Sequence, residues 1–206
     1  MESFWDSSPP LTFANEADVE HQLVQPLLYA LGYQTTDIAP KYPVEFREGR
    51  AGRKPEADFV CFNGTVHDRN TSLLVVEAKA PNESLTGGKQ QGESYAANLR
   101  ALVLVMTNGS RFEVWQLQLT RESDKVVDIA VRDLIANRGM LENILSRTAL
   151  INLCNRLDLK SFAKLGGNAS STRSRNMRAP RRMRKPSSEH FDIRQQRNKK
   201  RFRQII

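Results

Sequence analysis

The stretch Leu73-Leu74-Val75-Val76-Glu77-Ala78-Lys79 is an apolar strand that ends in two opposite charges. Because side chains alternate between the two faces of a strand, Glu77 and Lys79 should lie on the same face. A buried strand excludes charge unless the charged group has a partner, a metal ion or access to solvent. The stretch therefore predicts a functional acid and lysine side by side or, as the plainer alternative, a strand that frays into the loop at 80–82.

A second acid, Asp58, opens another apolar run, Phe59-Val60-Cys61-Phe62. If the two strands are neighbours, Asp58 and Glu77 can meet at one end of the sheet. Carboxylate oxygens suit Mg²⁺, which takes one or two carboxylates and keeps waters and phosphate oxygens in its shell. An ammonium beside such a metal can orient the attacking water or stabilise charge on phosphorus. We therefore predict a site for phosphodiester hydrolysis with Asp58 and Glu77 as Mg²⁺ ligands and Lys79 as a catalytic residue.

Two further sets of polar residues fall where this site could use them. Gln91 and Tyr95 are four residues apart on a predicted helix, so both face the same way and could touch the metal or the DNA backbone. The alternative for this pair is surface polarity with a half-buried tyrosine. Glu16, or Glu20 one turn later, could bring a third carboxylate to the metal. The alternative is that Glu16 only stabilises the helix, because a negative charge is favourable at the positive, N-terminal end of the helix dipole.

Hydrophobic periodicity and turn residues predict an α/β domain. Asn15 should cap a first helix that Gly32 ends, with a kink at Pro26. The other predicted elements are helices over 89–99 and 131–157, strands over 58–62, 73–78, 102–106 and 112–117, a turn at 107–110 and a short strand at 44–46.

Charge is distributed unevenly along the chain. Of a net charge of +8, residues 165–206 hold 13 Lys and Arg against 2 Asp and Glu, so that segment is +11 and the rest is −3. We expect a flexible leader over 1–12, a nuclease-type domain over 13–164 and a disordered basic tail over 165–206. The tail could contact a polyanion, nucleic acid first, or could simply be solvated.

Several classes of protein are disfavoured by the sequence. No apolar stretch approaches the ~20 residues of a membrane helix, so no membrane partner is expected. Cys61 and Cys154 lack metal-ligand spacing and no secretory signal precedes them, so a cytoplasmic location is expected. No Gly-x-x-x-x-Gly-Lys-Ser/Thr loop is present, so the chain should lack an ATP-driven motor.

In their order along the chain, these motifs resemble the N-terminal nuclease domain of type I restriction enzyme R subunits, a PD-(D/E)xK domain. The resemblance covers about Glu16 to Leu157 and includes these segments: 15–19, 30–33, 54–60, 75–81, 91–96 and 107–109. It implies a restriction-endonuclease-like fold, a mixed central sheet flanked by helices. It also implies these roles: Asp58 and Glu77 as Mg²⁺ ligands, Lys79 as the catalytic lysine, Gln91 and Tyr95 as an accessory Gln-x-x-x-Tyr motif, and Glu16 as the helix carboxylate.

The expected activity is that of a metal-dependent deoxyribonuclease, an endonuclease that hydrolyses DNA with Mg²⁺. By resemblance its partners would be DNA and the methyltransferase and specificity subunits of a restriction-modification complex. One departure is that a basic segment stands where such a subunit would continue into its helicase motor. The alternative is a catalytically weak DNA-binding or assembly module that keeps the nuclease fold.

Overall fold

A single sheet organises the protein, a computed structural model that describes residues 4–6, 12–45, 55–117 and 123–156. Among these residues six strands pair in the order β1-β2-β3-β4-β5-β6. Their bounds are Ile38–Pro43 (β1), Glu56–Phe62 (β2), Ser72–Ala78 (β3), Val103–Thr107 (β4), Arg111–Gln116 (β5) and Asp124–Ala130 (β6). β3 and β4 are parallel and the other neighbours are antiparallel. The sheet is therefore mixed, as expected.

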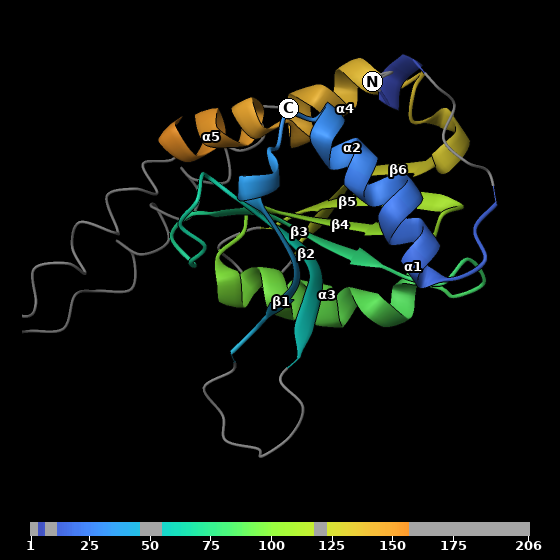
Figure 1. The fold of residues 1–206 in the computed structure, drawn as a ribbon, viewed down its shortest axis with the longest axis horizontal. Coiled ribbons are helices and arrows are strands. Elements are labelled where there is room, and N and C mark those ends of the chain that lie inside the picture. Colours follow the sequence, from blue (N-terminus) through green and yellow to red (C-terminus); the bar gives the residue numbers. More distant parts are fainter. Residues whose placement is uncertain (1–3, 7–11, 46–54, 118–122, 157–206) are drawn as a thin grey trace, which may run out of the picture. The chain divides into compact units, whose positions relative to one another are not determined.

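Helices cover both faces of this sheet (Figure 1). One long helix is divided into α1 (Glu16–Asp18), a π-helical turn (Val19–Val24) and α2 (Gln25–Ala30). The other helices are α3 (Leu85–Leu99), α4 (Arg138–Leu145) and α5 (Arg147–Arg156), and short 3₁₀ turns lie at Phe4–Asp6, Thr35–Asp37 and Val131–Asp133. Figure 1 shows α3 on one face and α2, α4 and α5 on the other. α3 is the crossover that two parallel strands require.

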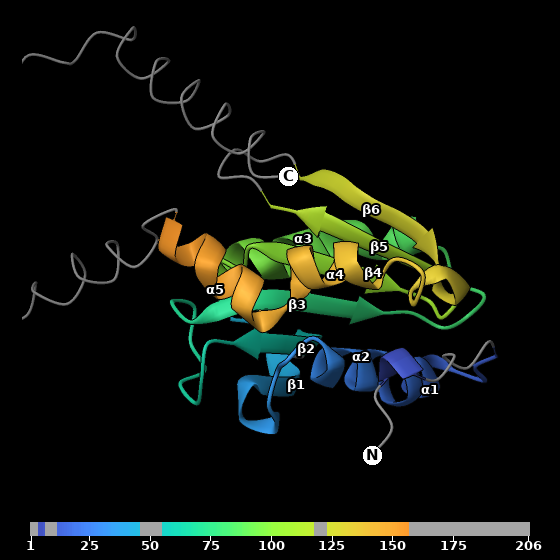
Figure 2. The same ribbon diagram turned by 90° about the horizontal axis from the view of Figure 1, so that it is seen from above.

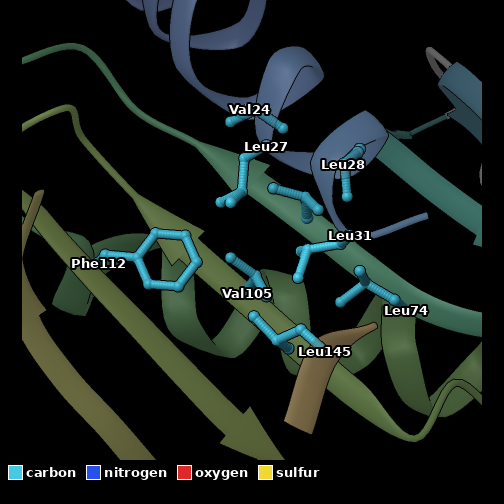
Figure 3. Close-up of a pocket in the computed structure, with 9 residues that line it drawn as sticks. Val24, Leu27, Leu28, Leu31, Leu74, Val105, Phe112 and Leu145 are labelled. Carbon is cyan, nitrogen blue, oxygen red and sulfur yellow. The ribbon is translucent and has the colours of Figure 1, made fainter. Parts of the chain in front are cut away.

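The larger core lies between the sheet and the helices α2, α4 and α5. Figure 2 shows these helices along one face, α2 toward β1 and β2 and α4 toward β4 and β5. In the close-up, Leu27 and Leu31 point from α2 toward Leu74 and Val105 of the sheet and Leu145 of α4 (Figure 3). The void between them holds only about 10 Å³ and is lined by apolar side chains. It is a packing defect of the core and carries no polar group for chemistry.

The first helix starts as the sequence predicts. The Asn15 side chain accepts a hydrogen bond from the backbone N–H of Asp18 at 2.9 Å, which is an N-cap. The chain leaves the helix through Gly32, whose φ of +90° is open to glycine at no steric cost. The π-helical turn ends at Val24, two residues before Pro26, and the kink expected at Pro26 stays a prediction. Proline cannot donate the backbone hydrogen bond of a regular helix, and such turns accompany breaks in the ladder.

The edge strand β1 differs from the prediction. The sequence predicts a strand at 44–46, whereas the strand occupies Ile38–Pro43; of the predicted range, Val44 and Glu45 follow the strand. Pro40 and Pro43 made this segment look like a loop, but an edge strand tolerates proline because one row of its backbone groups is unpaired.

The C-terminal half of the sheet and its helices also differ. β6 is missing from the prediction, because an edge strand with one buried residue and several charged ones lacks a clear apolar period. The helix predicted over 131–157 is a 3₁₀ turn followed by two helices. Ser146, with ψ of 148°, ends α4, and its hydroxyl accepts a hydrogen bond from the N–H of Ala149. A serine that caps the next helix therefore interrupts a continuous apolar pattern.

Within the range predicted as a flexible leader, 1–12, Phe4–Asp6 forms a 3₁₀ turn. Trp5 is buried in the main core, and its indole N–H donates to the carbonyl of Ala30 at 3.3 Å. An indole that can bury its ring and satisfy its N–H orders the backbone around it. The predicted basic tail, 165–206, lies outside the described residues.

Candidate active site

The pairing of β2 with β3 brings the two predicted acids to one end of the sheet. Phe59 lies opposite Val76 in this antiparallel pair, so Asp58 is one step beyond on β2 and Glu77 one step beyond on β3. The Asp58 carboxylate accepts a hydrogen bond through Oδ2 from the backbone N–H of Ala78 at 2.7 Å. Ala78 lies between Glu77 and Lys79 in the chain. The expectation that neighbouring strands join Asp58 to the Glu-x-Lys end of β3 is thus confirmed.

Helix α3 closes one side of this site through two glycines. A Cβ on Gly88 would lie 2.8 Å from Cε of Lys79, and one on Gly92 would lie 3.1 Å from Cγ of Glu77. The first separation would require the Lys79 side chain to shift, and the second would require Glu77 to give by a few tenths of an ångström. The absence of side chains at these two positions, one turn apart, therefore lets the helix lie close over Glu77 and Lys79. The predicted helix began at 89 because Gly87 and Gly88 resemble a loop, but α3 begins at Leu85.

Glu77 is the most constrained charge of the site. It is 2% exposed, and its Oε2 lies 3.8 Å from the ammonium of Lys79. Its other oxygen, Oε1, is buried without a hydrogen-bond partner in the described part of the chain. Burial, with a smaller contribution from the charge of Asp58, raises the pKa of Glu77 from 4.5 to about 8. An isolated buried carboxylate is strongly disfavoured, so Glu77 is left needing a proton or a cation.

The first helix contributes two more carboxylates. Oxygen atoms of Glu16, Glu20 and Asp58 all lie within 4.8 Å of one another. Sequence left open whether Glu16 or Glu20 is the helix carboxylate, and the structure brings both to Asp58. Burial, followed by the charge of Asp58, raises the pKa of Glu16. Among the described residues Glu77 does not belong to this tight group, although it interacts electrostatically with Asp58 and Glu16.

Lys41 completes the cluster and was not predicted. Its Nζ donates to Oε1 of Glu20 at 2.8 Å and to Oδ1 of Asp58 at 2.7 Å. Burial lowers the pKa of Lys41, but its hydrogen bonds to Asp58 and Glu20 outweigh that effect and raise the pKa above its usual value. Its backbone has a φ of +47°, which is unfavourable for a side chain with a Cβ. The one signal in the sequence is a lysine between prolines in Pro40-Lys41-Tyr42-Pro43.

Gln91 and Tyr95 do lie on the same helix but differ in exposure. Tyr95 is buried against the second core cluster, and Gln91 is exposed. The Gln91 side-chain amide donates a short hydrogen bond to the Tyr95 hydroxyl. The pair thus forms a polar unit on α3, one turn or less from Gly92. Its role at the site stays a prediction.

The donor set of this site suits a hard divalent cation. Four carboxylates (Glu16, Glu20, Asp58 and Glu77) face two ammonium groups (Lys41 and Lys79). When all are ionised, the excess is two negative charges, the charge that one divalent cation would neutralise. The orphaned Oε1 of Glu77 is a further observation that such a cation would explain. Carboxylate oxygens of this kind are the ligands that Mg²⁺ takes; its binding here, with Asp58 and Glu77 as ligands and Glu16 or Glu20 as a third, stays a prediction.

Other features of the described residues bear on expectations from the sequence. Cys61 and Cys154 do not form a disulfide with each other. No helix in the described ranges combines the length and the apolar character needed to cross a bilayer.

Comparison with known proteins gives one family. A family model described as type I restriction enzyme R protein N terminus (HSDR_N) matches residues 15–131. A solved fragment of a protein assigned as an HsdR subunit of a type I restriction enzyme from Vibrio vulnificus YJ016 is 25% identical, with a TM-score of 0.42. The match covers 63% of this chain and 26% of that one. No curated protein matches the chain. The range matched by the family contains every side chain of the site.

Proposed function

The chain belongs to the family of type I restriction enzyme R protein N-terminal domains, and from this premise we propose that its carboxylate cluster is a Mg²⁺-dependent site for the hydrolysis of DNA. The activity is that of an endonuclease of the PD-(D/E)xK kind. The chain spans about a quarter of the length of the solved structure that it matches, so its partners are proposed with its activity. They are DNA and the methyltransferase and specificity subunits of a restriction-modification complex.

The observation that carries the proposal is the state of Glu77. A carboxylate 2% exposed, with one oxygen lacking a hydrogen bond, is held in the fold at a substantial free-energy cost. The nearest cation among the described residues is Lys79, and its 3.8 Å separation from Oε2 is too long for a hydrogen bond. Such a side chain is more readily explained by a functional site than by a structural ion pair.

Each residue has a distinct proposed part in the reaction. Bound Mg²⁺ would supply a Lewis acid for a phosphate oxygen and lower the pKa of the attacking water. Asp58 would be a ligand of the metal, and its Oδ2 also accepts a hydrogen bond from the backbone N–H of Ala78. This hydrogen bond fixes the carboxylate against the neighbouring strand before any ligand arrives, so no reorientation is needed.

Lys79 would act on the phosphate and the attacking water. Its side chain is 18% exposed, so the ammonium can reach a bound substrate while its stem packs under Gly88. A positive charge placed there would stabilise negative charge on the transition state. Gln91 and Tyr95, on the same helix, would position the DNA backbone.

The proposal is tested by cleavage of linear DNA with Mg²⁺ by the purified chain. Lys79→Ala and Asp58→Ala should abolish cleavage, and Asp58→Asn should remove metal binding, while circular dichroism shows an unchanged fold. Asp128→Asn is a matched control, because Asp128 is an ion-paired aspartate on the far edge of the sheet. Undiminished cleavage by Lys79→Ala or Asp58→Ala would refute the assignment.

A second candidate function is a DNA-binding or assembly module with little turnover. The observation that favours it is the segment 165–206, with 13 Lys and Arg. Neutralising several phosphates with such a segment gives affinity that falls steeply with salt. Deleting the segment separates the two functions. Loss of DNA binding with metal-dependent chemistry retained assigns the segment an electrostatic role, whereas binding with a shallow salt dependence argues against phosphate contacts.

A further inference from the structure

We propose that Lys41 is a built-in counter-ion that occupies the place of a divalent cation between Glu20 and Asp58 and must leave these carboxylates when the metal binds. The inference rests on the proposed metal site and adds a regulation to it. Lys41 would hold the carboxylates together while the site is empty, and it would weaken metal binding by competing for the same oxygens.

The hydrogen bonds of Asp58 make the competition specific. Its Oδ2 is committed to the N–H of Ala78, and its Oδ1 accepts from Lys41 at 2.7 Å. Lys41 therefore occupies one of the two carboxylate oxygens of Asp58 that a metal would use. The same ammonium also takes Oε1 of Glu20 at 2.8 Å. An ammonium and a divalent cation repel each other at such separations, so they compete for these oxygens.

The backbone at Lys41 shows that this placement is imposed. Pro40 pairs with Phe59 and Tyr42 pairs with Ala57, so Lys41 lies between them, opposite Asp58. Its φ of +47° belongs to the left-handed region, which disfavours residues with a Cβ. A lysine kept in this conformation, with two ionic hydrogen bonds, is held by the surrounding structure, a situation that clusters at functional sites.

Lys41 also has room to move. Its side chain is 49% exposed, whereas those of Glu20 and Asp58 are almost fully buried. It lines a pocket of about 270 Å³ together with Glu20, Tyr29 and Pro40. The ammonium can therefore turn from the carboxylates into solvent without unfolding β1. The two acids cannot follow, so a cation that replaces Lys41 finds them in place.

The test measures metal binding without DNA, by titration calorimetry with Mn²⁺. Lys41→Met keeps the stem and removes the ammonium, and Lys41→Gly also relieves the left-handed backbone. Each variant should bind Mn²⁺ about tenfold more tightly or better, the equivalent of one charge-assisted hydrogen bond no longer broken. Lys125→Met is the matched control, because Lys125 also bridges two carboxylates, Glu113 and Asp128, but on the opposite edge of the sheet. It should leave Mn²⁺ affinity unchanged.

The outcomes separate this inference from the proposed function. If Asp58→Asn abolishes Mn²⁺ binding but neither Lys41 variant gains affinity, the counter-ion role is overturned and the metal site stands. If wild type and Asp58→Asn bind Mn²⁺ equally, or if neither they nor the Lys41 variants bind it, the metal site itself is wrong and the role of Lys41 falls with it. Should Lys41→Met fail to fold, Lys41→Gly decides the question, since it removes the backbone strain as well as the charge. A gain in both Lys41 variants, with none in Lys125→Met, supports the proposal.

Discussion

Replacing Glu77 by glutamine should stabilise the metal-free protein at neutral and alkaline pH. The pKa of Glu77 is raised from 4.5 to about 8, chiefly by burial. Below pH 4.5 the carboxyl is protonated in both folded and unfolded chains. Between these two pKa values the unfolded chain loses a proton that the folded chain keeps, so wild-type stability falls as pH rises, by at most about 1.4 kcal/mol per pH unit. Above pH 8 the penalty is complete. It is roughly 2 to 5 kcal/mol, with the upper end set by the full difference between the two pKa values.

Glutamine keeps the shape of Glu77 and cannot ionise. The free energies of unfolding of wild type and Glu77→Gln, measured by urea denaturation in EDTA, should diverge in favour of the variant from pH 5 to pH 8. Adding Mg²⁺ at pH 8 should reduce the difference in free energy of unfolding between the two proteins. A metal ion that binds the Glu77 carboxylate in the folded state stabilises wild type more than the variant, which lacks this carboxylate. Glu142→Gln, at a half-buried glutamate on α4 that pairs with Arg138, controls for the substitution itself. A difference that does not change with pH would refute the assignment of a buried, destabilised carboxylate.

The remaining predictions concern packing. Gly92→Ala should destabilise the fold by ~1–3 kcal/mol, because its Cβ would lie 2.9 Å from Cδ1 of the buried Leu104. Gly87→Ala, with nothing within 4 Å of the new Cβ, should stabilise it by ~0.4–1 kcal/mol, so thermal unfolding should shift in opposite directions for the two variants. Leu145→Ala should cost ~2–5 kcal/mol by enlarging the void beside it, which urea denaturation measures; a smaller loss would mean that the core collapses around the site.

Much of the site follows from patterns that are local in sequence. The strands that carry Asp58 and Glu77 are short apolar runs with a charge at one end, and buried central strands are read well from such runs. The two strands follow each other in the chain, and consecutive strands commonly pair antiparallel. The contact of Asp58 with the Glu-x-Lys end could therefore be predicted. The edge strands β1 and β6 could not. An edge strand buries few side chains, tolerates proline and carries charge, which removes the period on which prediction depends.

Lys41 shows why the rest of the site was beyond sequence reasoning. Its two partners, Glu20 and Asp58, come from a helix and a central strand, each many residues away in the chain. Nothing local indicates that a lysine between two prolines will face inward. Its orientation depends on the pairing of β1 with β2, which places it opposite Asp58 in a left-handed conformation. Sequence motifs thus predict ligands that lie at the ends of buried strands. A counter-ion on an edge strand can be identified only from the pairing of the strands in the sheet. Metal affinity estimated from the motif residues alone would therefore omit Lys41, the group proposed to compete with the metal.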